Sequence, residues 1–181
     1  MPACAKQTKK NGFGAVNVGA VIDFPFGESS FKSKLSSVKE CIKIGADQAT
    51  VAIPSMLLSK TEIKNFKKQV KKLGKIRKIE VGVSLNASDL DEDKIKLALK
   101  ILNKSKLAFI TFAFGDATFI EVKEKLRVIN KYRASKKICV LANADRAEAI
   151  TELFKFKVDY ILTPYADAIG DDLLKRFNLK V

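Results

Sequence analysis

The sequence predicts an α/β protein with a parallel sheet, and two observations lead to this prediction. Short apolar runs rich in β-branched residues alternate with amphipathic segments along the whole chain. The runs are nearly continuous in hydrophobicity, which is typical of parallel strands covered on both faces. Strand–helix alternation implies right-handed crossovers between neighbouring strands. Two architectures meet these conditions, a doubly wound open sheet and part of a (β/α)8 barrel.

Six apolar runs are predicted to be strands. The first, Ala15–Phe24, reads AVNVGAVIDF and carries Asp23 as its single charge. The other five are Gln48–Ile53, Lys78–Leu85, Leu107–Phe114, Lys137–Ala142 and Asp159–Thr163.

Amphipathic segments between these runs are predicted to be helices. Over Ser29–Ile44, apolar residues recur on one face, and Lys34 is among the lysines placed off that face. A second helix begins near Ser59 or Thr61, either of which can cap it, and stops at Gly74. The remaining helices are expected over Asp91–Asn103, Thr118–Tyr132, Asp145–Lys155, Asp171–Phe177 and the N-terminal segment up to Lys10.

The composition predicts one domain spanning residues 1–181 and excludes several kinds of site. The chain is 47% apolar, enough for one core. It has no histidine, which excludes a Ser-His-Asp triad and a histidine-ligated metal. Its three cysteines, Cys4, Cys41 and Cys139, form no Cys-x-x-Cys pair, so we expect no metal site and a reducing, cytoplasmic location. No apolar run is long enough to span a membrane.

The net charge of +14 comes mainly from lysine, with 29 Lys and 5 Arg. Lysine enrichment without arginine is weak evidence for a nucleic-acid reader, because bidentate base and phosphate contacts depend on arginine. The stretch Lys60–Lys78 nevertheless holds nine basic residues against one acid, Glu62. It is either a solvated helix face or a docking face for an acidic partner, RNA or anionic lipid. The candidate binding residues are Lys64, Lys67, Lys68, Lys71 and Lys72.

Two stretches favour the barrel. Val18–Gly27 reads VGAVIDFPFG, and Gly45–Leu58 reads GADQATVAIPSMLL. Both resemble the third and fourth strands of the deoxyribose-phosphate aldolases, a family of class I, Schiff-base (β/α)8 barrels. Fainter similarity continues to about residue 165. The resemblance implies an incomplete TIM barrel of about six parallel strands that lacks its first βα units, since only about 14 residues precede Ala15.

The resemblance also implies where the reactive residues of the family would stand, and this chain departs from the family at each position. Thr111 occupies the position of the Schiff-base lysine, Leu141 that of the second lysine, and Thr50 that of the family's acid. A Schiff base requires a primary amine, which threonine and leucine lack. We therefore expect an aldolase-like pseudoenzyme that binds, scaffolds or assembles, needing no cofactor. Two alternatives stay open: an aldolase or related carbon–carbon lyase with residual activity, and a basic protein associated with nucleic acid or ribosomes.

Three acids are expected at the rim where the barrel strands end, namely Asp23, Asp116 and Asp145. They are either a carboxylate cluster for a divalent cation or solvated loop acids, with Asp116 and Asp145 suited to cap helices.

A barrel without two of its strands has two open edges, at Ala15–Phe24 and Asp159–Thr163. The edges could pair with each other in a six-stranded barrel, be covered by the N-terminal and C-terminal segments, or meet another chain. Six strands enclose little interior, which the bulky Phe112 and Phe114 would crowd, and the flanking segments are short and largely polar. We therefore expect a homo-oligomer, or a complex with another protein, that buries Val16, Val18 or Val21.

Overall fold

The structure is a computed structural model that describes residues 17–165 and 169–170. The helices expected up to Lys10 and over Asp171–Phe177 lie outside this part. The strands are β1 (Gly19–Ile22), β2 (Gln48–Ala52), β3 (Glu80–Asn86), β4 (Phe109–Ala113), β5 (Lys137–Leu141) and β6 (Tyr160–Leu162). The helices are α2 (Phe31–Lys43), α3 (Ile63–Leu73), α4 (Glu92–Leu102), α5 (Phe119–Tyr132) and α6 (Ala147–Phe154), with short 3₁₀ helices η1 (Ser55–Leu58) and η2 (Ala87–Asp89).

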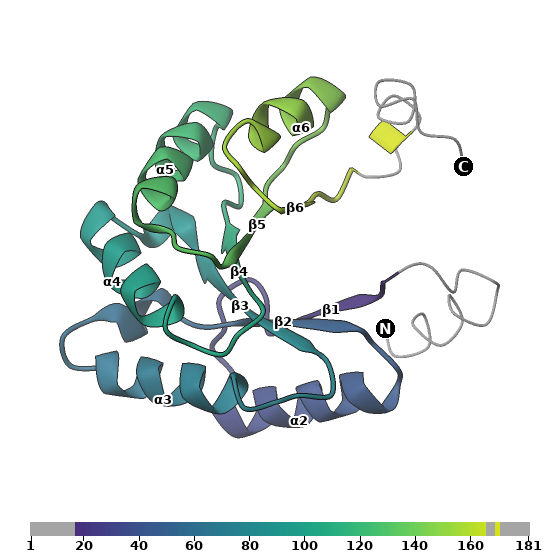
Figure 1. Cartoon of the computed structure of the whole chain (residues 1–181), viewed down its shortest axis with the longest axis vertical. Coiled ribbons are helices and arrows are strands. Elements are labelled where there is room, and N and C mark those ends of the chain that lie inside the picture. The colour runs from purple at the N-terminus through teal and green to yellow at the C-terminus, as the bar shows by residue number, and fades with distance from the viewer. Residues whose placement is uncertain (1–16, 166–168, 171–181) are drawn as a thin grey trace.

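All six strands are parallel and lie in chain order, from β1 to β6, in one sheet. The sheet curls into a half-barrel with the helices on its outer side (Figure 1). Within the described residues, β1 and β6 each pair on one side only, so the sheet has two edges. The predicted fold class, an incomplete (β/α) barrel with six parallel strands, is confirmed. None of the helices in the described ranges is long and apolar enough to cross a membrane.

The first strand is shorter than predicted, with four residues instead of ten. Pairing starts at Val18, whose carbonyl accepts the amides of Asp47 and Gln48 and whose amide donates to the Asp47 carboxylate at 2.8 Å. The strand ends at Ile22, because the next residue, Asp23, adopts a left-handed backbone with φ of 60°. Residues 15 and 16 of the predicted strand lie outside the described part.

The outer face of the sheet is apolar and buried beneath the helices. It carries Ile22, Val51, Val83, Ile110 and Val140, which are all less than 8% exposed. Phe112 is in register with Leu85 and Val140 and is fully buried in this outer layer. The expectation that Phe112 crowds the barrel interior is therefore wrong.

The helix boundaries follow from local capping. Thr118 begins α5 in a capping box with Glu121, and the Asp91 side chain caps α4. Ser59 accepts the amide of Glu62 just before α3, so it contributes a cap-like contact there. Asp116 and Asp145 cap neither α5 nor α6, contrary to their predicted role, because Thr118 and Arg146 occupy the cap positions.

Lys34 also departs from the prediction. Its side chain is 2% exposed, although the sequence pattern places it off the apolar face of α2. Its ammonium group donates to the carbonyl oxygen of Gly27 and lies 3.3 Å from a carboxylate oxygen of Asp23. Through these two contacts, the buried lysine fixes the loop between β1 and α2.

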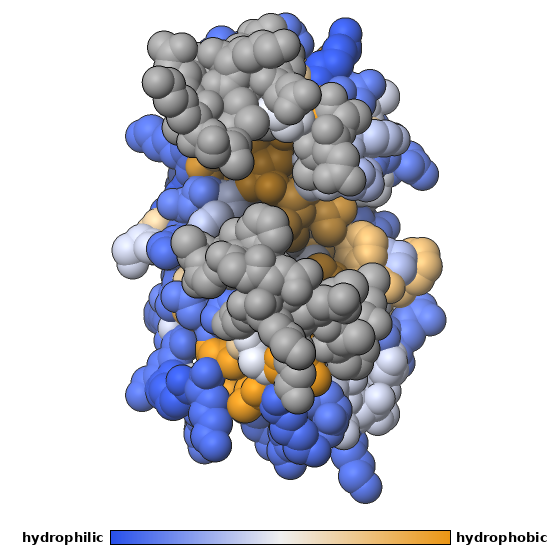
Figure 2. Space-filling view, turned by 90° about the vertical axis from the view of Figure 1, so that its right-hand side faces the viewer, coloured by the Kyte–Doolittle hydropathy of each residue, from blue (hydrophilic) through white to orange (hydrophobic). Residues whose placement is uncertain are grey.

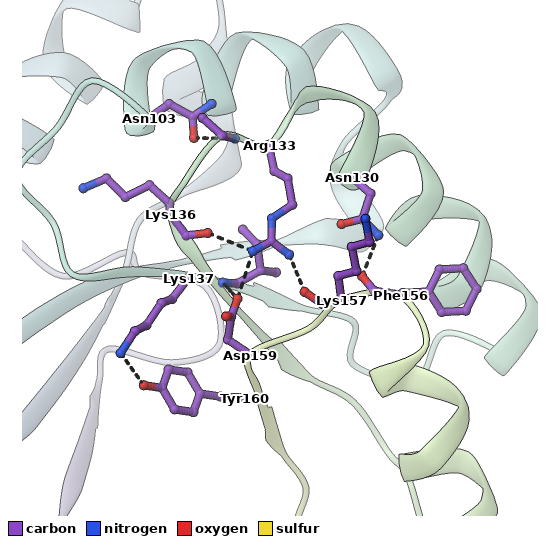
Figure 3. Close-up of polar contacts among 11 residues, drawn as sticks. Asn103, Asn130, Arg133, Lys136, Lys137, Phe156, Lys157, Asp159 and Tyr160 are labelled. Atoms are coloured by element: carbon purple, nitrogen blue, oxygen red, sulfur yellow. Dashed lines mark hydrogen bonds and ion pairs between the residues drawn. The ribbon is translucent and has the colours of Figure 1, made fainter.

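Polar side chains tie the strands together at the end of the sheet where the strands begin (Figure 3). The guanidinium group of Arg133 donates to the carbonyls of Lys157 and Lys136 and to the carboxylate of Asp159, the last at 3.0 Å. The same Asp159 oxygen accepts the amide of Ile138 at 2.8 Å. Arg133 thus links the end of α5 to the starts of β5 and β6.

Candidate functional site

The concave face of the half-barrel is the surface on which the resemblance places its reactive residues. Parallel strands in register point equivalent side chains to the same side. Thr50 is in register with Gly82, Thr111 with Ser84 and Cys139, and Leu141 with Ala113 and Leu162. All three predicted positions therefore face the interior, on successive levels from the strand starts toward the strand ends.

The environment of Thr111 is small, polar and buried. Ser84, Thr111 and Cys139 stand side by side on β3, β4 and β5, each less than 4% exposed. Burial raises the pKa of the Cys139 thiol to about 11, against a smaller lowering by the neighbouring Thr111 hydroxyl. A thiol with this pKa is protonated at neutral pH and is a poor nucleophile. This level of the interior therefore offers hydroxyl and thiol groups but no amine.

Next to this level, toward the strand starts, an aromatic ring fills the interior. Phe109 of β4 lies over Gly82 of β3, and a Cβ atom built on that glycine would come within 2.2 Å of the ring. The ring packs edge-on against Tyr160, with centroids 6.4 Å apart. The Tyr160 hydroxyl accepts a hydrogen bond from Lys137 at 2.9 Å, close to the strand starts (Figure 3). The part of the half-barrel interior nearest the strand starts is thus a packed core.

Two lysines reach the rim where the strands end, and sequence reasoning missed both because they come from helices. Lys34 of α2 contacts the loop after β1, as described above. Lys125 of α5 donates to three carbonyl oxygens, of Ala87, Ser88 and Leu90, at 2.6, 3.2 and 2.7 Å. An ammonium group has three N–H donors, so all those of Lys125 are engaged.

Burial lowers the pKa of both Lys34 and Lys125, against opposing effects of nearby carboxylates. A lowered pKa favours amine chemistry, but a group that donates to carbonyls is held as the ammonium ion and has no free lone pair. The geometry therefore makes these two lysines loop clamps.

The three rim acids do not form a cluster. Asp23 accepts from the Ser29 amide and hydroxyl at 2.9 and 2.6 Å. Burial by itself raises the pKa of Asp23, but the hydrogen bonds from Ser29 and Lys34 outweigh it and hold the pKa below its ordinary value. Asp116 accepts from Asn143, and Asp145 pairs with Arg146. Among the described residues, no group of three acids or cysteines is arranged to hold a metal ion.

An open groove of about 1000 Å³ runs along β1. It is lined by Val18 to Phe24 of the strand and the loop after it, by Ser33, Ser36 and Glu40 of α2, and by Leu141. The side chain of Val21 is 46% exposed there. Figure 2 looks at the open side of the half-barrel, where apolar surface is visible at the centre of the molecule.

The candidate binding lysines of α3 lie on the outer layer, away from the concave face. All five are exposed. Lys67 and Lys71 face α4, where they line a groove with Lys104 and Lys106. Lys72 lies on the other side, 5.8 Å from the centre of the Phe31 ring of α2. The fold thus separates the predicted reactive positions from the predicted basic face.

Known proteins share this fold and part of the sequence. The chain is 26% identical over 157 residues to the deoxyribose-phosphate aldolase of Clostridioides difficile (strain 630). The matched region covers 86% of this chain and 70% of that protein. A solved structure described as QR15, an aldolase, matches with a TM-score of 0.83 at 21% identity, over 99% of this chain and 82% of that one. The deoxyribose phosphate aldolase from Aeropyrum pernix, described as a unique tetramer, matches at 0.75 and 18% identity, over 98% and 75%. No family model matches the chain.

The fold and the concave face define an aldolase-type α/β half-barrel. The chain is a distant relative of the deoxyribose-phosphate aldolases, and the resemblance in its sequence is confirmed.

Proposed function

We propose that this chain is an aldolase-fold binding and assembly protein that carries out no Schiff-base chemistry. The proposal rests on one observation: in the described residues, the half of the concave face nearest the strand ends presents no free amine. Thr111 and Leu141 stand at the family positions, and the single strand lysine on this face, Lys137, lies at the opposite end. Barrel enzymes place their chemistry at the strand ends.

The runner-up is an aldolase with residual activity, which the sequence similarity to an aldolase favours. A retro-aldol assay on deoxyribose 5-phosphate, coupled to the reduction of the acetaldehyde released, separates the two. The proposal expects no turnover above that of a heat-denatured sample. Turnover that saturates with substrate would establish the aldolase instead.

The partner that the open edge fits is a second copy of the chain. Along β1, one row of backbone groups has no strand partner within the described part, and Val21 and Phe24 are 46% and 41% exposed. Edge strands of this kind pair readily with another strand. The related fold from Aeropyrum pernix is described as a tetramer, which supports self-association as the route.

Sedimentation velocity at micromolar concentration tests the assembly. We expect a particle of twice the 20.0 kDa chain mass. Val21→Lys places a charge in the groove and should give a monomer that keeps its far-UV circular dichroism. Met56→Lys, at a side chain that is 71% exposed at the rim after β2, is the matched control and should remain dimeric. A soluble wild-type monomer would refute the edge-mediated dimer.

A further inference from the structure

The fold sorts the charges of the connecting loops to opposite ends of the half-barrel. Loops that lead from a strand into the next helix carry mainly acids, namely Asp23, Glu28, Glu62, Asp89, Asp91, Asp116 and Asp145, with Lys60 and Arg146 as the bases. Loops that lead from a helix into the next strand carry Lys75, Arg77, Lys78, Lys104, Lys106, Arg133, Lys136, Lys155 and Lys157, with Asp47 and Asp159 as the acids. The end where the strands begin is therefore strongly basic, and the opposite rim is acidic.

At the basic end, a groove of about 430 Å³ separates α3 from α4. Its charged lining consists of Lys67, Lys71, Lys75, Arg77, Lys104 and Lys106, and it includes no acid. Val70, Gly74 and Ile101 also line it. A Cβ atom on Gly74 would lie 3.3 Å from the amide nitrogen of Lys106, so the end of α3 and the loop after α4 are in close contact. This contact brings together cations that lie about 30 residues apart in the sequence.

The lysines of this α3–α4 groove are not used to hold the fold together. None of them forms an ion pair with an acid of the described residues or donates to one of the helix-end carbonyls. The carbonyls at these helix ends have other donors, because Arg77 donates to Gly74 at 3.0 Å and Ser105 donates to Leu102 at 2.6 Å. Five ammonium groups therefore line one groove without a countercharge from the described protein, which gives the groove a positive potential that attracts anions.

We propose that the α3–α4 groove binds the sugar–phosphate backbone of single-stranded nucleic acid. At about 430 Å³ the groove is too small for a duplex but is open enough for the backbone of a single strand to lie along it. Successive lysines on the α3 side, Lys67 and Lys71, are one helical turn apart, which gives a row of point charges repeating about every 6 Å. The groove presents no aromatic side chain on which a base could stack. Binding is therefore to phosphates and independent of base sequence.

The residue types suit contacts to a backbone rather than to bases. Five of the six cations here are lysines, which bind phosphate as point charges and lack the planar fork with which arginine reads a base edge. A membrane surface calls for apolar anchors beside the charges. The large apolar side chains exposed in the described ranges lie at the acidic rim or along the open edges, with the exception of Phe154.

Fluorescence anisotropy with a labelled 20-nucleotide oligouridylate and the full chain tests the proposal. With six contacts to a single strand, the slope of log K against log salt is about −4, and affinity falls by about 300-fold between 50 and 200 mM salt. The groove variant Lys67→Gln/Lys71→Gln/Lys104→Gln removes three contacts. We expect its slope to fall to about −2 and its affinity at 50 mM salt to drop by about tenfold or more.

The matched control is Lys32→Gln/Lys39→Gln/Lys60→Gln, which removes the same charge from exposed positions on α2 and on the acidic rim. It should bind as the wild type does, and an oligomer of mixed sequence should bind as oligouridylate does. An equal loss of affinity in both variants would mean that binding depends only on net charge, and it would overturn the proposed groove site. Absence of binding at 50 mM salt would do the same, as would tighter groove-dependent binding to polyglutamate or to vesicles containing phosphatidylserine.

Discussion

The contact between Gly82 and Phe109 provides a sharp test of how the interior is packed. Gly82→Ala puts a methyl group where the Phe109 ring lies, with the nearest ring carbons 2.2, 2.4 and 2.7 Å from the new atom. Such distances are far inside van der Waals contact, so the ring must move. It has little freedom to do so, because it is 4% exposed and packs against Tyr160.

The magnitude follows from the two single changes. Overpacking a core by one methyl group costs about 1–3 kcal/mol, so Gly82→Ala should lower the free energy of unfolding by about 2 kcal/mol. Phe109→Ala removes the ring and should cost about 3 kcal/mol or more. In the Phe109→Ala background the clash is absent and alanine restricts the unfolded chain, so Gly82→Ala should be neutral or slightly stabilising.

Urea denaturation of the four proteins in this cycle gives the coupling free energy, which we expect to be about 2 kcal/mol in favour of the double variant. Additive effects, with a coupling below about 0.5 kcal/mol, would mean that the ring does not lie over Gly82. The interior next to Thr111, toward the strand starts, would then be open rather than packed.

Four further predictions concern buried polar groups. Arg133→Lys replaces the fork that joins Asp159 to two carbonyls and should lower the free energy of unfolding by about 1–2 kcal/mol in urea denaturation; an unchanged midpoint would contradict the linking role. Lys34→Met keeps the aliphatic stem but loses the ammonium contacts and should cost about 2 kcal/mol. Hydrogen bonding keeps the pKa of Asp23 below its ordinary value despite burial, so its contribution is complete above about pH 4 and is lost as the pH falls through the folded-state pKa; Asp23→Asn should make acid unfolding less steep, and an unaltered acid limb would contradict this. Burial raises the pKa of Cys139 to about 11, so above about pH 9 the unfolded chain releases a proton that the folded chain keeps, and stability should fall by up to about 1.4 kcal/mol per pH unit; in Cys139→Ser the alkaline slope should be shallower, and equal slopes would contradict it.

The order of the elements was predictable because it depends on local periodicity. The six strands and the five described helices occur where the apolar runs and amphipathic segments predict them. The direction of individual side chains was less predictable. The run FITFA in β4 is buried on both faces, so its hydrophobicity does not alternate, and the sequence alone cannot indicate that Phe109 faces the interior while Phe112 faces the helices.

The candidate site was also predictable only in part. The resemblance identified Thr50, Thr111 and Leu141 as the family positions, and the strand register of the structure places all three on the concave face. The burial of Lys34 could not be read from helical periodicity, since it depends on Gly27 and Asp23 in the preceding loop. The sequence predicted only the α3 side of the α3–α4 groove, as a lysine-rich stretch. Lys104 and Lys106 join it through tertiary contact between α3 and the loop after α4.

The central claim is that no lysine of this chain forms a Schiff base with an aldehyde substrate. Incubation with deoxyribose 5-phosphate, reduction with borohydride and intact-mass measurement test it most directly, because reduction converts any imine into a stable secondary amine. The deoxyribose-phosphate aldolase of Clostridioides difficile serves as the control that should gain one adduct. This chain should keep its unmodified mass. A stoichiometric adduct that maps to a single lysine would contradict the account and would identify the chain as a working Schiff-base enzyme.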